Sequence, residues 1–427
     1  MPAWILAVAA AVSAAAVAAP VPLERLVEDA VKSNPEVRLY RAALDEAKAR
    51  RETAGKAAPP EISGSVGSQQ VRDTSNRFNG EGTLWSVGVS RTFEWPGRLG
   101  LRRSIADGDV ALAELGLARF RNALGGKVRA AALGLADAEE KARATSAVTA
   151  RLRELREVLL RRDPAGISPR LELRILDATE LTLRRQATGA SLEADSARRE
   201  LRLLLGLAAD AAAPEVDAPR MDLPEAPSAE ALVASAMTNN FDLRLRLAEV
   251  GQQGLRVALT RNERGPAFTV NPLFREEPAG GRNQFFEVGI SFPLPLWKQQ
   301  KTKIAAEEAR LEQARTLVEL ARRGVERDVL AAQTAYEAKR SELRRWSPES
   351  VAEFAAAAAS ADEHYRLGAV TVTTYVEMQR QYVDAVAALL DTRREAVASA
   401  ADLETLTGLR VLPSPSVETT PNTNTAR

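Results

Sequence analysis

WSVGVSRTF, residues 85–93, alternates large apolar side chains with small or polar ones, and FEVGISFPL, residues 286–294, repeats the alternation. Successive side chains of a strand point to opposite faces, so each stretch predicts a strand with one apolar and one small polar face. Weaker partner strands precede them at 62–66 and 268–270, with turn-forming residues at 73–82 and 278–283 between. The sequence therefore predicts two β-hairpins, at residues 61–95 and 266–295.

The hairpins belong to a sequence pattern that occurs twice in the chain, about 200 residues apart. An internal repeat defines the structural unit, which here is half the chain. We expect a first repeat at 19–207, a linker at 208–227, a second repeat at 228–408 and a disordered tail at 409–427. The matched residues are Val27, Ala30, Asn34, Arg38, Leu39 and Ala42 with Val233, Ala236, Asn240, Arg244, Leu245 and Ala248; Val87, Gly88 and Ser90 with Val288, Gly289 and Ser291; and Leu201, Leu204 and Gly206 with Leu403, Leu406 and Gly408.

Long helices surround each predicted hairpin. Residues 101–162 are rich in Ala, Leu, Arg and Glu and contain no proline, which as one helix would span roughly 90 Å. Helices are also expected at 23–56, with an interruption at 33–35, and at the matching 229–262. Turns at 163–166 and 367–369 reverse the chain, so each repeat also contains a long helical hairpin. Taken alone, the helices favour an antiparallel coiled-coil rod.

The strands point instead to a membrane barrel. Segments 61–97 and 266–297 hold ten of the twenty aromatic residues, as expected where aromatic side chains flank a lipid-facing band. Four strands cannot close a barrel, and lipid tolerates no open sheet edge. A barrel with a channel needs more than ~8 strands, so three chains with twelve strands are the natural count. Soluble hairpins on a helical body are the alternative.

Composition excludes several other functions. The 58 Lys and Arg nearly cancel the 57 Asp and Glu, so no global charge recruits nucleic acid. With no cysteine and one histidine, His364, neither disulfides nor a transition-metal site is expected. No nucleophile and base form a recognisable pair, so we predict that the chain is not an enzyme and needs no cofactor. Residues 1–18 are read as a secretory signal peptide, with an uncleaved anchor as the alternative.

Several segments resemble the TolC-type outer-membrane efflux proteins, and the resemblance extends over nearly all of the chain after the signal peptide. They are Asn34-Pro35-Glu36, Val288 to Pro295 leading into Leu296-Trp297, Tyr365-Arg366-Leu367-Gly368, and Leu403 to Gly408. Phe93-Glu94-Trp95-Pro96-Gly97-Arg98 is similar to the segment after the first hairpin in the cobalt-zinc-cadmium branch, which favours heavy-metal export, with export of drugs or other small toxins as the alternative.

The resemblance implies a mixed, mainly α fold: duplicated helical hairpins that form a periplasmic tunnel, and four strands per chain in a shared twelve-stranded trimeric barrel. It implies a homotrimer in outer-membrane lipid of a Gram-negative bacterium. The implied partners are a periplasmic adaptor (membrane fusion protein) and an inner-membrane pump of the resistance-nodulation-division class. The chain would then be a passive export duct. The alternative function is a soluble periplasmic coiled-coil adaptor or scaffold.

The same resemblance selects candidate residues of a pore constriction. Glu377, nine residues after Gly368, matches a pore-tip acid, and Glu172 is its counterpart in the first repeat. Three copies of a carboxylate form an anionic ring that favours cations. Thr374 stands where the family has a second acid, and Tyr375 and Arg170 are expected to make gate-holding contacts. The alternative is that Glu377 and Glu172 are solvated surface residues.

Turns and tryptophans complete the candidate sites. Leu367 and Gly368, with Pro164 and Gly166, are predicted to dock the adaptor, although turn geometry alone also explains their glycines. Trp85, Trp95 and Trp297 are predicted to anchor the barrel at the membrane interface, with packing in a soluble core as the alternative. No metal site is assigned: His364 lies beside Asp362 and Glu363, but adjacent helical residues point in different directions.

Overall fold

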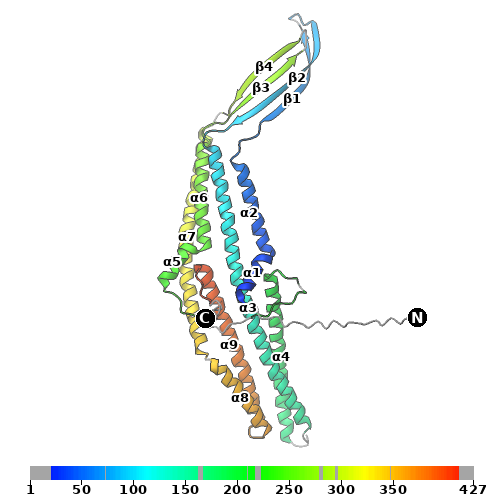
Figure 1. Cartoon of the computed structure of the whole chain (residues 1–427), viewed down its shortest axis with the longest axis vertical. Coiled ribbons are helices and arrows are strands. Elements are labelled where there is room, and N and C mark those ends of the chain that lie inside the picture. The colour runs from blue at the N-terminus through cyan, green and yellow to red at the C-terminus, as the bar shows by residue number, and fades with distance from the viewer. Residues whose placement is uncertain are drawn as a thin grey trace, which may run out of the picture. The chain divides into compact units, whose positions relative to one another are not determined.

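A computed structural model describes residues 21–72, 74–161, 167–208, 210–216, 223–277, 282–293, 297–346 and 348–412. The predicted signal peptide, the reversal at 163–166 and the tail beyond 412 lie outside these residues. Both halves of the chain have the same order of elements: two helices, two strands and long helices (Figure 1). The elements are α1 (Leu23–Ser33), α2 (Pro35–Ala54), β1 (Glu61–Arg72), β2 (Phe78–Phe93), α3 (Arg98–Arg161), α4 (Ile167–Leu204), α5 (Ala229–Asn239), α6 (Phe241–Asn262), β3 (Phe268–Glu277), β4 (Asn283–Ser291), α7 (Trp297–Arg345), α8 (Pro348–Arg366) and α9 (Val372–Thr407).

An asparagine separates the first two helices of each half. Asn34 lies between α1 and α2, and Asn240 lies between α5 and α6. Both are buried: Asn34 donates to the carbonyl of Leu204 at 2.9 Å, and Asn240 accepts from the amide of Leu243 at 3.1 Å. An asparagine side chain satisfies backbone groups left open at a helix end, which explains both interruptions.

Glycines end the last helix of each half. Gly206 follows α4 with φ 67°, and Gly408 follows α9 with φ 70°. A side chain is strained in this left-handed conformation, and a Cβ on Gly206 would also lie 2.8 Å from the carbonyl oxygen of Ser33. The two glycines that match in the sequence therefore have the same role in the structure.

The chain divides into two compact units, and each takes segments from both halves of the sequence. One unit comprises residues 1–35, 121–229 and 330–427, and the other comprises 36–120 and 230–329. No helix in the described part of the chain is both long and apolar enough to cross a membrane.

The first unit contains a helical core between the ends of α3, α4, α8 and α9. Its largest fully buried members include Tyr375, Leu152 and Leu176, each less than 2 % exposed. Apolar side chains recur on one face of each helix and cover one another, as in an antiparallel bundle. The buried cluster consists of Val148, Leu152, Leu155, Leu176, Leu183, Ala361, Tyr365, Val372, Tyr375, Val376 and Val383.

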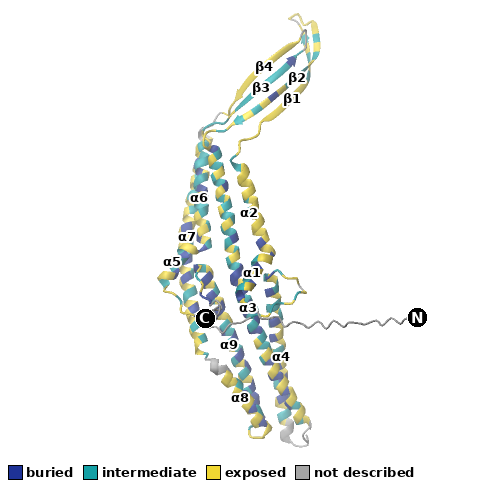
Figure 2. Ribbon diagram, viewed as in Figure 1, coloured by how far each residue is buried: buried dark blue, intermediate teal, exposed yellow. Residues whose placement is uncertain are grey.

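The second unit contains a four-stranded antiparallel sheet in the order β1-β2-β3-β4 (Figure 1). Two pairs, β1 with β2 and β3 with β4, are the predicted hairpins. The central pair, β2 with β3, joins strands about 180 residues apart in the chain, with Phe93 opposite Phe268. The outer strands β1 and β4 each have one edge without a partner strand within the described chain. Figure 2 shows β4 exposed along its whole length.

Candidate functional site: a two-faced sheet, its helical junction and the α8–α9 turn

The sheet has one apolar and one polar face, as the alternation predicted. The register places Gly64 beside Val87, and Val87 beside Phe274, which in turn lies beside Phe286. The apolar face is Ile62, Val66, Trp85, Val87, Val89, Phe93, Phe268, Val270, Phe274, Phe286, Val288 and Ile290; the polar face includes Ser63, Ser65, Ser86, Ser90, Thr92, Thr269, Asn271 and Ser291.

The apolar face is open to the surroundings within this chain. Ile62 and Val66 are each 79 % exposed, and Phe286 is 75 % exposed. A continuous exposed apolar patch of this kind marks a surface that a membrane or another protein covers. Arg91 shares the face near the helices, with its guanidinium carbon 5.4 Å from the ring centroid of Phe93.

Aromatic pairs lie toward both ends of the apolar face. Phe93 stacks on Phe268 at the end nearest the helices, with ring centroids 5.1 Å apart. Trp85 contacts Phe274 toward the other end, with ring centroids 5.5 Å apart. The nine residues from Trp85 to Phe93 span ~27 Å along the strand, or ~21 Å across a bilayer at the usual tilt. This arrangement fits a lipid-facing band bounded by two aromatic girdles.

The predicted tryptophan anchors occupy different positions. Trp85 is part of the apolar face and is 36 % exposed. Trp95 lies just beyond β2 and is 47 % exposed, and a Cβ on Gly265 would lie 2.2 Å from its ring. The third predicted anchor, Trp297, begins α7, and its side chain lies outside the described part.

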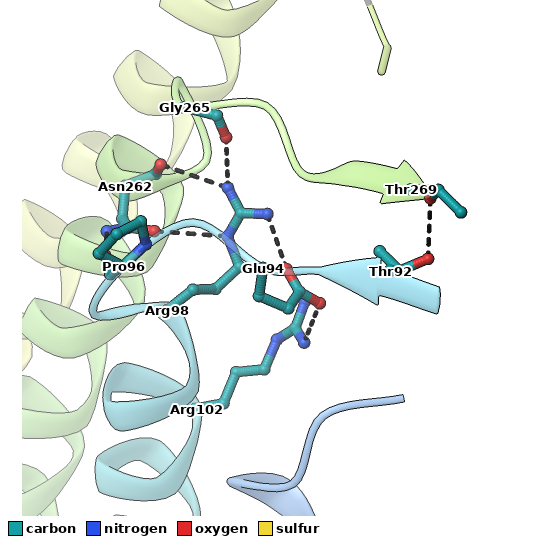
Figure 3. Close-up of polar contacts among 8 residues, drawn as sticks. All are labelled: Thr92, Glu94, Pro96, Arg98, Arg102, Asn262, Gly265 and Thr269. Atoms are coloured by element: carbon teal, nitrogen blue, oxygen red, sulfur yellow. Dashed lines mark hydrogen bonds and ion pairs between the residues drawn. The ribbon is translucent and has the colours of Figure 1, made fainter. Parts of the chain in front are cut away.

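A buried arginine joins the two segments that connect helices to the central strands (Figure 3). Arg98, at the start of α3, donates to Glu94 at 2.8 Å and to the carbonyl of Gly265 at 2.6 Å. It also contacts the side chain of Asn262 at 3.3 Å, and Asn262 donates back to the carbonyl of Pro96 at 2.9 Å. These contacts connect the β2–α3 segment to the α6–β3 segment.

The carboxylate of Glu94 is held by two guanidinium groups. Arg102 donates to its second oxygen at 2.9 Å, so Arg98 and Arg102 occupy both oxygens (Figure 3). Burial alone would raise the pKa of Glu94, but the hydrogen bonds from these two arginines outweigh burial and hold the pKa below its usual range. At the adjoining strand ends, the hydroxyls of Thr92 and Thr269 lie 2.9 Å apart across β2 and β3. The cluster thus holds the base of the central strand pair.

The turn between α8 and α9 is well defined. Leu367 is 75 % exposed, and Gly368 has φ 73° with open space where a Cβ would lie. The amide of Ala369 donates to the carbonyl of His364 at 2.8 Å, which closes the helix end around the glycine. The predicted reversal at 367–369 is therefore present. Pro164 and Gly166, the other predicted docking residues, lie outside the described part.

Tyr365 of α8 connects two of the predicted constriction residues. Its hydroxyl donates to Glu172 of α4 at 3.3 Å, and its ring stacks on that of Tyr375 in α9, with centroids 5.3 Å apart. The next residue, Arg366, pairs with Glu154 of α3 at 3.8 Å. Polar contacts from the end of α8 thus reach both helices of the other hairpin.

The remaining constriction candidates lie apart from this contact. Tyr375 is buried, and burial together with the charge of Asp362 raises the pKa of its phenol. Glu377 and Thr374 are exposed on α9, and Glu377 accepts a hydrogen bond from Gln381 at 2.9 Å. Arg170 lies in α4, and its side chain is outside the described part.

Sequence reasoning did not select Tyr365, Arg98 or Arg102 as working residues. Tyr365 and Arg98 stand inside the two segments that carried the family resemblance, so the motifs contained them. Their partners are far away: Glu172 precedes Tyr365 by 193 residues, and Asn262 follows Arg98 by 164. Only the fold brings these side chains together.

Comparisons with known proteins agree with this architecture. A sequence model of the outer membrane efflux protein family matches residues 26–207. No curated protein sequence matches the chain significantly. Among solved structures with the same fold, the Campylobacter jejuni CmeC outer membrane channel has a TM-score of 0.74 and 16% sequence identity, and the match covers 90% of this chain and 85% of that chain. A membrane protein from Pseudomonas aeruginosa has a TM-score of 0.74 and 19% identity, with 90% of each chain covered. The open state of the Neisseria gonorrhoeae MtrE outer membrane channel has a TM-score of 0.68 and 16% identity, with 91% of this chain and 89% of that chain covered.

An open sheet with an exposed apolar face, joined in the chain to long helical hairpins, is the fold that this chain shares with the solved outer membrane channels CmeC and MtrE. The predicted resemblance to the TolC-type outer-membrane efflux proteins is confirmed, in sequence over residues 26–207 and in fold over 90% of the chain. The solved relatives CmeC and MtrE are outer membrane channels, which agrees with the prediction of a channel rather than an enzyme.

Proposed function

We propose that this chain is the outer-membrane channel of an efflux system, a passive duct from the periplasm to the outside. The observation that carries the proposal is the sheet's exposed apolar face, which ends in aromatic pairs on both sides. Such a face is unfavourable in water and matches the hydrocarbon layer. The opposite polar face then lines the lumen.

Closure of the barrel requires further copies of the chain. Because lipid cannot satisfy unpaired backbone groups, the free edges of β1 and β4 must find partners. In the antiparallel order, β1 and β4 run in opposite directions, so β4 of one copy can pair antiparallel with β1 of the next. Three copies give twelve strands, enough for an open lumen. The functional unit is therefore a homotrimer.

The helical end supplies the gate and the docking surface in this proposal. The contact of Tyr365 with Glu172 restrains α8 against α4, and Glu377 adds an exposed acid on α9. Three copies of these carboxylates form an anionic ring that favours cations, and movement of the helices opens it. Leu367 and Gly368 present an exposed turn to a periplasmic adaptor.

An adaptor and an inner-membrane pump of the resistance-nodulation-division class supply the cargo and the energy. Heavy-metal cations are the proposed cargo, from the resemblance of residues 93–98 to the cobalt-zinc-cadmium branch. Glu94 itself is not a metal ligand in this proposal, because Arg98 and Arg102 occupy its two oxygens.

The test is the mass of the protein extracted from membranes in mild detergent, by light scattering corrected for bound detergent, followed by conductance in planar bilayers. We expect a mass of three chains and ion conductance. A water-soluble monomer would refute the channel and favour a coiled-coil scaffold.

A further inference from the structure

Three charged side chains lie together on the polar face of the sheet, toward the end away from the helices. Arg275 of β3 forms ion pairs with Glu277 at 3.2 Å and with Glu287 of β4 at 2.9 Å. Its guanidinium also lies 5.2 Å from the ring centroid of Phe285. The ring and the two carboxylates fix the position of the cation, and we call Arg275, Glu277 and Glu287 the strand triad.

The register assigns the strand triad to the polar face. Arg275 lies opposite Ser86 of β2, whose hydroxyl is 2.8 Å from that of Ser65. The residues on either side of Arg275, Phe274 and Glu276, belong to the other face because side chains alternate along a strand. All three members of the triad are partly accessible, with Glu287 the most exposed at 48 % of its side chain.

The triad has a net charge, because one guanidinium faces two carboxylates. Each chain therefore contributes one net negative charge at this level, next to Trp85 and Phe274, toward the end of the sheet away from the helices. Three copies contribute three. Twelve strands ~4.8 Å apart and tilted by ~40° enclose a barrel of ~12 Å backbone radius. That radius is close to the ~10 Å screening length in 0.1 M salt, so the charges act on ions throughout the lumen.

We propose that the strand triad is a second determinant of ion selectivity, at the outlet of the duct and separate from the acids of the helical end. Glu277 and Glu287 favour cations, and Arg275 limits that preference. This inference rests on the proposed function, since it requires the polar face to line a conducting lumen.

The test is the potassium-to-chloride permeability ratio of purified channels in planar bilayers, from reversal potentials across a KCl gradient. Removing three charges at ~12 Å changes this ratio about threefold near 0.1 M salt and about tenfold near 0.01 M. We therefore expect Glu287→Gln to lower the ratio and Arg275→Gln to raise it by these factors. Glu277→Gln repeats the first change at a second site and replaces it if Glu287→Gln does not assemble.

Glu276→Gln is the matched control. Glu276 is adjacent to Glu277 and loses the same charge, but it lies on the opposite face, where it accepts from Arg282 at 2.8 Å. We expect Glu276→Gln to change the ratio much less than Glu277→Gln does, because its charge lies farther from the lumen on the outer face. The inference is overturned, and the proposed function left standing, if all four variants conduct with the same permeability ratio. The same holds if Glu276→Gln and Glu277→Gln change the ratio equally. Absence of conductance in the unaltered protein would overturn the proposed function and the inference with it.

Discussion

Arg98 is the residue whose loss should do most damage to the junction between helices and strands. Its side chain is 7 % exposed and connects Glu94 to the carbonyl of Gly265. Arg98→Ala breaks several charge-assisted hydrogen bonds in a buried place, so we expect a loss of about 3 kcal/mol in the free energy of unfolding. Denaturant unfolding in detergent measures it. Arg103→Ala, at an exposed position of α3, is the control and should cost less than about 0.5 kcal/mol. Equal effects of the two variants would contradict the assignment.

Glu94 should make the same junction sensitive to acid. Its pKa is held below the usual value in the folded protein, so its contribution to stability is present above the ordinary carboxyl pKa and is lost as the pH falls through the lowered one. Between about pH 6 and about pH 3, the unaltered protein should therefore lose stability more steeply than Glu94→Gln. Parallel pH profiles of the melting temperature would show that Glu94 does not stabilise the junction through its charge.

At the scale of elements, the hydroxyl of Tyr365 contributes to the restraint of α8 against α4. Tyr365→Phe keeps the ring stacked on Tyr375 but removes the hydrogen bond to Glu172. Loss of one such bond is worth about 1 kcal/mol, or about a fivefold shift per copy toward the open state if the contact is made only in the closed state. Single-channel recording should show this as a higher open probability. Tyr382→Phe is the control, because Tyr382 packs against the same cluster. An unchanged open probability would remove Tyr365 from the gate.

Some elements could be predicted from local sequence patterns, and others could not. Local patterns were sufficient for the long helices and for both hairpins: residues 101–162 were expected to be helical, and α3 runs from Arg98 to Arg161. The central pairing of β2 with β3 is different, because strands so distant in the chain are aligned by contacts such as that of Arg98 with Asn262. The acid Glu172 could be selected as the counterpart of Glu377 in the first repeat, but its pairing with Tyr365 could not be predicted, since that pairing depends on helix packing.

At the scale of the whole molecule, the same substitution should prevent assembly on one face of the sheet and be tolerated on the other. Val89 lies on the apolar face of β2, and Ser90 lies on the polar face. An arginine facing the middle of a bilayer costs about 2–4 kcal/mol per copy, and thus about 6–12 kcal/mol per trimer. Val89→Arg should therefore abolish recovery of assembled protein from the outer membrane, whereas Ser90→Arg should not. Loss of both variants, or of neither, would contradict the assignment of the faces.

The edges of the sheet give the most direct test of how copies combine. Pairing β4 of one copy with β1 of the next brings their residues to the spacing that a disulfide requires, with Cα atoms about 4.4–6.8 Å apart. The chain has no cysteine, so any disulfide that forms must join the introduced cysteines. Gly64→Cys combined in turn with Phe286→Cys, Val288→Cys and Ile290→Cys samples the register on the apolar face. One of these pairs should give a covalent trimer on oxidation that returns to monomer on reduction.

Single-cysteine versions of the same chains are the controls, because they cannot form a closed ring of three covalent links. If no pair along the two edges forms a trimer, although light scattering gives a mass of three chains, the copies associate through their helices and the sheet edges must be satisfied otherwise. If oxidation gives covalent dimers and no larger species, the interface has two-fold symmetry. Such an interface joins only two sheet edges and leaves the others open to lipid. The covalent trimer is the outcome expected from the antiparallel order of the four strands.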